Sequence, residues 1–360
     1  MYSFIFADHS RTLAARGVEV AFTTLAEAEG FLQQPGKLLV GAIPFHRRDP
    51  AYLFQPDSWE FGEKLPQLET WLDAQVIGVE DHPSPQEHQR AVAQAVETIK
   101  QGSLKKIVLS RAQRYQLAAP VSAEAILAKY MATAGTGYGY LTAVGGGAYF
   151  VGPSPEVLIR KQGRWIESFP LAGTAPRSHD PEIDNARAQA LLTSTKDHVE
   201  HAYVTEGIAE VLGPLCTHLE VPPQPELMHT AHTWHLGTKI VGQLAEDISA
   251  LSLAHMLHPT AAVNGHPAPQ AREMLARQEP NRNFYSGVVG WADSQGNGEW
   301  RVSIRSALVE PEAITAYAGG GIVADSVPAE ELAETSAKLG PIRAVLGLEP
   351  EKLTLNTDVD

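Results

Sequence analysis

The chain has 360 residues, of which 44% are hydrophobic and 19% charged, and these proportions suit one large globular domain or two ordinary ones. Its net charge of -14 argues against a nucleic acid or an anionic membrane as a partner, because both attract basic surfaces. The single cysteine, Cys216, excludes an internal disulfide and a cysteine-based zinc site. We find no signal peptide and no run of about 18 apolar residues, so we expect a soluble, cytoplasmic protein without a membrane span.

The first part of the chain predicts short strands at Tyr2–Ala7 and Lys37–Phe45 around a helix near Leu25–Gln33. No residue pattern in this part indicates chemistry. A strong helix start follows, because Ser84 is a good N-cap residue, a proline occupies the first helical position, and Glu87 completes a capping box.

We divide the chain into three parts on this basis. Residues 1–80 are the N-terminal part of the fold, residues 81–348 are the main functional region, and residues 349–360 form a loose acidic tail. No Gly/Ser-rich linker separates the first two parts, which favours a single domain.

A β-branched strand with basic ends is predicted at residues 105–111. Alternation mixes apolar and polar side chains on both faces, which indicates a strand covered on both sides. This arrangement would draw Lys106 inward. The simpler interpretation is a lysine that snorkels to solvent at a strand end.

A helix at Ser122–Thr133 and a series of short strands come next. Pro155 fixes the turn that sets the Glu156 carboxylate at the start of one of these strands. The predicted strands are Tyr138–Val144, Ala148–Val151, Glu156–Arg160 and Trp165–Phe169.

Residues 181–213 predict a long helix in which Asp197 and Glu200 share a stripe with the apolar Val204, Ile208 and Val211. Two carboxylates on a buried stripe need a cation, because burying unpaired charge is costly. The alternative is an acidic first turn favoured by the helix dipole. A helix start near Ile183 disfavours that alternative.

Three histidines, His229, His232 and His235, have a spacing that would suit a metal site on a helix. The β-branched run Thr238–Val241 instead predicts a strand, which sends alternate side chains to opposite faces. We therefore disfavour a zinc site here.

Two further strands are predicted at Phe284–Trp291 and Trp300–Val309, and Arg305 lies in the second among small neighbours with room for an anion. An ordinary surface arginine is the alternative. After a strand from Ile314, the glycines Gly319, Gly320 and Gly321 precede a break and a helix.

That last helix carries Glu331, Glu334 and Lys338 on one face. Glycine N–H groups can bind an anion, and two carboxylates one helical turn apart can bind a divalent cation. The simpler interpretation is a tight turn before a surface helix with solvated acids.

Taken together, these motifs resemble those of the chorismate-utilising enzymes, and most closely the isochorismate synthases. The matching segments follow the family order over residues 85–345, and residues 1–80 add little. They are Lys106–Arg111, Ser154–Glu156, Pro170–Thr174, Lys196–His201, Trp234–Leu236, Leu257–Thr260, Gly290–Asp293, Gly298–Trp300, Ile304–Arg305, Ala318–Val323 and Glu331–Lys338.

The resemblance implies an α+β chorismate-binding fold, with antiparallel sheets stacked inside a coat of helices. It also implies chorismate as the small-molecule substrate, water attack at C2 of its ring and loss of the C4 hydroxyl. Lys106 would be the base that activates water and Glu156 the acid that protonates the leaving hydroxyl. Burial shifts the pKa of each type of group in the direction that these roles require.

The resemblance further implies a Mg²⁺ site and an anion site. Glu200 and Glu334 would hold the metal, with Asp197 and Glu331 acting through water. The enolpyruvyl carboxylate of the substrate would lie on Arg305, Tyr285 and the backbone N–H groups near Gly319 and Gly321. The remaining pocket residues would be Thr174, His235 and Lys338.

The assignment to a subfamily depends on fewer residues than the assignment to the family. Ala172 stands where one branch of aminodeoxychorismate synthases carries a nucleophilic lysine, which disfavours that branch. Thr260–Gly265 departs from the Thr-Pro-Ala-Val-Cys-Gly pattern of related synthases, and its Asn264 adds a polar group.

Phe284–Gly287 resembles salicylate synthases, so salicylate synthesis with loss of pyruvate is the alternative activity. A non-catalytic chorismate-binding partner of a larger complex is a further alternative. We expect no glutaminase subunit, and a monomer or a weak homo-oligomer.

Overall fold

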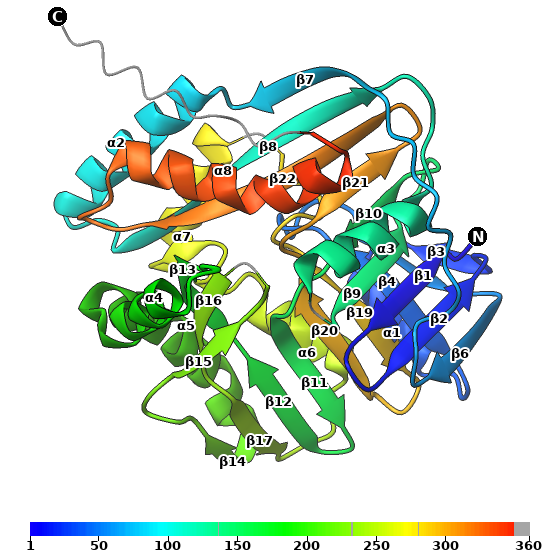
Figure 1. Cartoon of the computed structure of the whole chain (residues 1–360). Coiled ribbons are helices and arrows are strands. Elements are labelled where there is room, and N and C mark those ends of the chain that lie inside the picture. The colour runs from blue at the N-terminus through cyan, green and yellow to red at the C-terminus, as the bar shows by residue number, and fades with distance from the viewer. Residues whose placement is uncertain (136, 232, 280, 349–360) are drawn as a thin grey trace, which may run out of the picture.

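Two large antiparallel sheets lie face to face in the computed structural model, which describes residues 1–348 except Thr136, His232 and Pro280 (Figure 1). Aromatic and aliphatic side chains from both sheets, among them Phe4, Val40 and Phe150, fill the space between them. Apolar alternation along the strands supplies this core, because one face of each strand must be buried.

Ten strands of the described chain form the first sheet, in the order β18, β8, β22, β21, β10, β9, β1, β2 and β6, with β7 paired to β8. Their bounds are Gly265–His266 (β18), Lys106–Leu117 (β8), Ala313–Ile322 (β22), Ala307–Glu310 (β21), Tyr149–Gly152 (β10), Gly139–Ala143 (β9), Phe4–Ala7 (β1), Thr12–Arg16 (β2), Ser58–Gly62 (β6) and Val76–His82 (β7).

Nine strands of the described chain form the second sheet, in the order β14, β17, β12, β11, β20, β19, β4, β5 and β3. Their bounds are Cys216–Glu220 (β14), Ile240–Leu244 (β17), Trp165–Phe169 (β12), Val157–Gln162 (β11), Gly298–Val302 (β20), Val288–Asp293 (β19), Leu38–Ile43 (β4), Tyr52–Gln55 (β5) and Val20–Phe22 (β3). A small third sheet contains Leu171–Pro176 (β13), Thr233–Gly237 (β16) and Glu226–His229 (β15).

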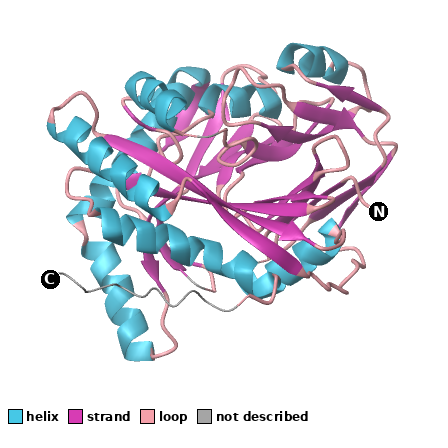
Figure 2. Ribbon diagram, turned by 90° about the horizontal axis from the view of Figure 1, so that it is seen from above, coloured by secondary structure: helices cyan, strands magenta, loops and turns pink. Residues whose placement is uncertain are grey.

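Helices cover the outer faces of this arrangement (Figure 2). Helices α3 and α8 pack on the first sheet, α6 packs on the second, and α4 and α5 pack on the third. The helices are Leu25–Leu32 (α1), Pro85–Lys100 (α2), Ala123–Ala134 (α3), Pro181–Thr193 (α4), Thr195–Leu212 (α5), Ala250–Leu257 (α6), Ala268–Gln278 (α7) and Pro328–Val345 (α8), with a 3-10 turn at Gly213–Leu215.

The observed architecture is the predicted α+β fold of antiparallel sheets with a helical coat. The predicted capping box of α2 is present, since Ser84 Oγ accepts the N–H of Glu87 and the Glu87 side chain accepts the N–H of Ser84. The first 80 residues contribute strands to both large sheets.

The single helix predicted over residues 181–213 is wrong. The chain leaves the helical conformation at Ser194, whose ψ of 110° separates α4 from α5, and Ser194 Oγ accepts the N–H of Asp197 at 3.2 Å. Asp197 therefore lies in the first turn of α5, as in the alternative of an acidic first turn. Asp197 and Glu200 are half-buried, whereas Val204 and Ile208 further along the helix are fully buried.

The interpretation of residues 319–321 as a turn and two strand predictions are also corrected. Residues 319–321 continue β22 and pair with β8, so these glycines do not form the turn before the last helix. Arg305 lies in neither β20 nor β21 but in the bend between them, with φ of +55°. Residues 284–287 form a turn, and β19 begins only at Val288.

Candidate active site

A cavity of about 230 Å³ opens where the first sheet meets the small third sheet and helices α5 and α8. It collects residues from ten separate segments of the described chain. Of the residues predicted as site residues, the cavity is lined by Glu156, Thr174, Asp197, Glu200, His235, Tyr285, Arg305, Gly319, Gly321, Glu334 and Lys338. Lys106 and Glu331 lie behind this lining: Lys106 pairs with Glu200, and a Cβ atom added at Gly320 would lie 3.2 Å from Glu331 Oε2.

Lys106 lies at the start of β8 and is fully buried. Its Nζ atom lies 2.8 Å from Oε1 of Glu200 on helix α5. The interpretation of a snorkelling lysine is therefore wrong, and the inward one is right. Gly321 on β22 leaves room for this pair, because a Cβ atom there would overlap Glu200 Oε1 and lie 3.2 Å from Lys106 Cε.

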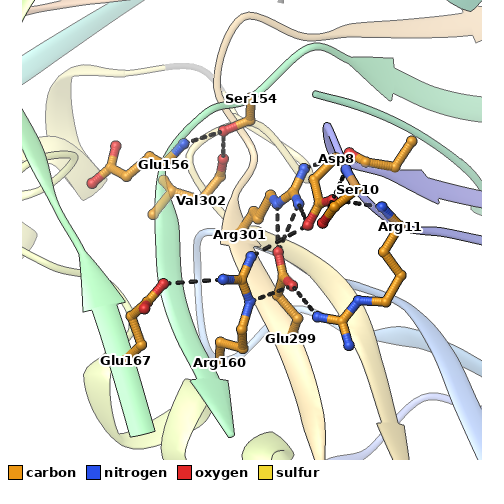
Figure 3. A network of polar contacts seen from close by, with 11 residues as sticks. Asp8, Ser10, Arg11, Ser154, Glu156, Arg160, Glu167, Glu299, Arg301 and Val302 are labelled. Carbon is orange, nitrogen blue, oxygen red and sulfur yellow. Dashed lines mark hydrogen bonds and ion pairs between the residues drawn. The ribbon is translucent and has the colours of Figure 1, made fainter. Parts of the chain in front are cut away.

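Glu156 is 2% exposed, and burial raises its pKa to about 8 although Leu171 N–H, Lys106 and Arg305 act in the other direction. The carboxyl group is therefore protonated at neutral pH. Its backbone is fixed by Ser154, whose hydroxyl accepts the Glu156 N–H at 3.4 Å and donates to Val302 O at 2.5 Å (Figure 3).

A buried charge cluster lies below this turn, and the Glu156 carboxyl group points away from it (Figure 3). Arg301 of β20 donates to Glu299 and to the carbonyl of Ala7, while Arg160 binds the other oxygen of Glu299 at 2.8 Å. Asp8 lies 3.7 Å from Arg301. None of these five residues lines the cavity, and the cluster joins the end of β1 to the second sheet.

His235 is neutral, because burial and the nearby Arg305 lower its pKa to about 3. Its Nδ1 atom lies 3.1 Å from Gly173 O and 3.2 Å from Thr174 Oγ1. A proton on Nδ1 that is donated to Gly173 O leaves Nε2 as an acceptor for Arg305 Nη2 at 3.3 Å. The histidine thus orients the arginine without adding charge.

Tyr285 stacks on Tyr317, with ring centroids 5.2 Å apart and planes 10° from parallel. Burial raises the pKa of Tyr285 to about 12, so its phenol keeps its proton and can donate it to an anion. The phenol oxygen approaches Gly319 so closely that a Cβ there would lie 2.9 Å from it.

The N–H groups of Gly319 and Gly321 face the same cavity edge. In an antiparallel ladder alternate residues point to opposite sides, and the Tyr317 N–H points away from β8 to Ser306 O at 3.2 Å. Gly319 and Gly321 share that direction. Lys338 Nζ binds the Gly319 carbonyl at 2.9 Å on this side.

Four carboxylates gather where α5 approaches α8. Burial and the neighbouring Glu200 and Glu334 raise the pKa of Asp197. Burial likewise raises the pKa of Glu331, which is 4% exposed and whose Oε2 has no hydrogen-bond partner. Burial acts in the same direction on Glu334, but Lys338 at 2.6 Å and Lys196 hold its pKa below the usual value.

These acids form two lysine pairs rather than a closed ligand shell. Glu200 pairs with Lys106, and Glu334 pairs with Lys338. Among the described residues, no three His, Cys, Asp or Glu side chains converge tightly enough to form a metal site. Oxygen-only donors, the raised pKa values of Asp197 and Glu331 and the unpartnered oxygen of Glu331 nevertheless fit a hard divalent cation such as Mg²⁺.

Sequence reasoning missed several cavity residues, among them Val108, Lys196, Val263, Ser286 and Tyr317. Val108 and Lys196 had a usable signal, because both lie inside segments that match the family, Lys106–Arg111 and Lys196–His201. The histidine array gives no zinc site on the described residues: His229 and His235 lie on separate strands, and His232 is outside the described part. Asn264 is buried outside the cavity lining and donates to Ala268 O.

The family described as "Chorismate binding enzyme" matches residues 56–347 of this sequence. The chain belongs to the chorismate binding enzymes. It is 37% identical to the isochorismate synthase DhbC of Bacillus subtilis over 96% of this chain and 94% of that protein. It is 36% identical to the isochorismate synthase EntC of Escherichia coli over 90% of this chain and 84% of that protein.

Solved structures of chorismate binding enzymes and their relatives agree with the fold. MenF, the menaquinone-specific isochorismate synthase from Escherichia coli, superposes with a TM-score of 0.85 at 26% identity, over 96% of this chain and 89% of that one. Anthranilate synthase component I from Streptococcus pneumoniae superposes with a TM-score of 0.79 at 18% identity, over 94% of this chain and 92% of that one, which supports the fold alone. No helix in the described part of this chain is long and apolar enough to span a membrane.

Proposed function

We propose that this chorismate binding enzyme is an isochorismate synthase, which isomerises chorismate to isochorismate. The observation that carries the proposal is one cavity with a buried lysine, Lys106, behind one wall and a protonated carboxyl group, Glu156, in another. Relatives named isochorismate synthases at 36% and 37% identity over most of the chain support it.

The reaction needs a base and an acid on opposite sides of the ring. Lys106 accepts a proton from water as the water oxygen bonds to C2, the ring double bond shifts, and the C4 hydroxyl leaves. Glu156 donates its proton to that hydroxyl, which departs as water. One water enters and one leaves, so the net reaction is an isomerisation. General acid and general base catalysis contribute about 10²–10⁴-fold each.

We assign the enolpyruvyl carboxylate of the substrate to Arg305, Tyr285 and the N–H groups of Gly319 and Gly321. A guanidinium can bind a carboxylate through two parallel hydrogen bonds, and the neutral phenol and the two amides add uncharged donors. His235 holds Arg305 in place on one side, and Thr174 contacts the other ring nitrogen of His235. Lys338 adds positive charge next to Gly319.

We further propose that Glu200 and Glu334 hold a Mg²⁺ ion, with Asp197 and Glu331 acting through water. The ion supplies positive charge that neutralises the ring carboxylate of chorismate and orients it. The four carboxylates span α5 and α8, so these residues would tie the two helices together at the cavity. Without the Mg²⁺ ion, Lys106 neutralises Glu200 and Lys338 neutralises Glu334, which are two of the four acids.

The comparisons reported above do not favour the alternative of a salicylate synthase. We expect the same soluble enzyme to act in the cytoplasm without a glutaminase subunit, as a monomer or a weak homo-oligomer. Ala172 in the cavity wall, in place of a nucleophilic lysine, supports a reaction that uses water.

Chromatography of the purified protein with chorismate, with Mg²⁺ or with EDTA, tests this proposal. We expect isochorismate only with Mg²⁺, in a reaction that stops short of full conversion because it is reversible. Salicylate with equimolar pyruvate would replace the proposal by the lyase activity. No product under either condition would favour a non-catalytic chorismate-binding protein.

A further inference from the structure

We infer that Arg282 is a positioning residue that sets the spacing between two walls of the cavity. It is 1% exposed and follows helix α7, outside the cavity itself. Its guanidinium donates to the carbonyls of Val108 at 2.6 Å and Val263 at 2.7 Å. Val108 and Val263 both line the cavity, one from strand β8 and the other from the loop that precedes β18.

Arg282 therefore joins the two walls from outside the cavity. Backbone bonds also connect them, since the Val108 N–H donates to Asn264 O at 3.0 Å and β18 pairs with β8. Arg282 adds a side-chain connection by binding a carbonyl on each side. Lys106, the proposed base, lies on the same strand two residues before Val108, so a shift of β8 at Val108 moves Lys106 as well.

Glu279 fixes the guanidinium in this position. The Glu279 carboxylate is 6% exposed and accepts Arg282 Nε at 2.6 Å. It also accepts the backbone N–H and the hydroxyl of Ser110, the residue two positions beyond Val108 on β8. The ring of Phe45 lies 4.2 Å below the guanidinium. The three acceptors bind three different nitrogens of the guanidinium, Nε, Nη1 and Nη2. A lysine carries its donors on a single nitrogen and does not match this spread of acceptors.

The consequence for catalysis follows from geometry. The base and the acid come from different sheets, and a misplacement of about 1 Å costs about 10²-fold in rate when reacting groups must be aligned. A residue that only stabilises the fold would change the free energy of unfolding, and the protein that remains folded would keep its turnover. Arg282 is expected to change turnover itself.

The chain offers a closely matched control in Arg301. It is also fully buried and donates to a carboxylate, that of Glu299 (Figure 3). It also donates to the backbone carbonyl of Ala7 at 2.8 Å and lies 4.3 Å above an aromatic ring, that of Phe6. Its partners do not line the cavity. R282K and R301K therefore make the same chemical change in similar surroundings, and only Arg282 bonds directly to residues that line the cavity.

The experiment compares the wild type, R282K, R301K and E279Q by steady-state kinetics and by hydrogen exchange with mass spectrometry. We expect both arginine variants to lower Tm. For folded R282K we expect kcat to fall about ten- to hundredfold with little change in KM, whereas R301K keeps kcat within about twofold of the wild type. Peptides covering residues 106–110 and 260–266 should exchange faster in R282K and unchanged in R301K.

Equal losses of kcat in R282K and R301K, or wild-type kcat in R282K, would overturn the inference. If R282K does not fold, E279Q decides, because it keeps the side-chain shape and weakens the hold on Arg282 together with the bonds to Ser110 on β8; it should lower kcat in the same direction. The kinetic measurements rest on the proposed function, but the hydrogen-exchange measurements do not. If the wild type makes no isochorismate, unchanged exchange in the two peptides of R282K would still refute the positioning role.

Discussion

The Nζ atom of Lys106 and the Oε1 atom of Glu200 lie 2.8 Å apart, with the lysine fully buried and the glutamate side chain 15% exposed at the cavity. The pair joins the start of strand β8 to helix α5. The proposed mechanism gives these two residues different tasks, proton transfer for Lys106 and metal binding for Glu200. A change at either residue should therefore affect both tasks.

Replacing Lys106 by glutamine should abolish most of the activity. The variant removes the proposed base and leaves Glu200 without its counter-ion, so we expect turnover to fall about 10²–10⁴-fold. The adjacent Lys105 is exposed and provides the matched control, since K105Q should keep turnover close to that of the wild type. Initial rates of isochorismate formation, with circular dichroism to verify folding, test this. An active K106Q enzyme would contradict the assignment of the base.

Alanine at Gly321 should disrupt the same pair by sterics alone. The added Cβ would overlap Glu200 Oε1 and lie 3.2 Å from Lys106 Cε, so one of the two side chains must move. We expect a folded protein with turnover reduced about tenfold or more. In G207A, by contrast, the added methyl group inside α5 has no atom within 4 Å beyond the neighbouring residues of its own helix, and this position should gain about 0.5–1 kcal/mol of stability. Normal turnover in G321A would show that the pair tolerates displacement.

The pH dependence should reflect Glu156. Because its pKa in the folded protein is about 8, the proton that it donates is present at neutral pH and is lost as the pH rises through about 8. The rate at saturating Mg²⁺ should therefore decline on the alkaline side with an apparent pKa near that value. A rate that stays constant to pH 10 would contradict the role of Glu156 as the acid.

Stability should depend on the same group. An unfolded glutamate has a pKa near 4.5, so between about pH 4.5 and 8 the folded state holds a proton that the unfolded state releases. The free energy of unfolding must then fall as the pH rises through that range. E156Q cannot ionise, so its Tm should increasingly exceed that of the wild type as the pH approaches 8. Parallel Tm curves for the two proteins would indicate that Glu156 is already ionised in the folded state.

How much of this could be predicted from the sequence depended on whether the signal was local. The capping box at Ser84 and Glu87 was predicted correctly because its atoms lie within one turn of chain. Ser194 was a local signal that we missed, since a serine three residues before Asp197 marks a new helix start. The resemblance to chorismate-utilising enzymes brought together residues that no periodicity could connect.

Other features depend on contacts between distant parts of the chain. Gly319, Gly320 and Gly321 are extended because they pair with β8, some 200 residues earlier. The positive φ of Arg305 is set by the neighbouring strands, since arginine itself disfavours that conformation. The hold of Arg282 on Val108 and Val263 likewise requires the folded topology.

The metal assignment is tested by Glu334→Gln. Gln keeps the size of the side chain and removes the negative charge that the proposed Mg²⁺ site needs, so Mg²⁺-dependent activity should fall about 10²-fold or more. The fold should survive, because the Glu334 side chain is 39% exposed and its main partner is Lys338. E330Q removes the same charge from an exposed position in the first turn of α8 and should behave like the wild type.

If E334Q loses activity, Mg²⁺ titrations of the rate and of Tm show whether the variant binds Mg²⁺ more weakly or is impaired for another reason. If Glu334 is a ligand, E334Q should require more Mg²⁺ for both the rate and the rise in Tm that bound metal produces, whereas E330Q shows the wild-type response. EDTA should abolish the activity of the wild type and lower its Tm to the metal-free value. Wild-type rates and an unchanged Mg²⁺ response in E334Q would mean that the cation, if required, binds elsewhere in the cavity.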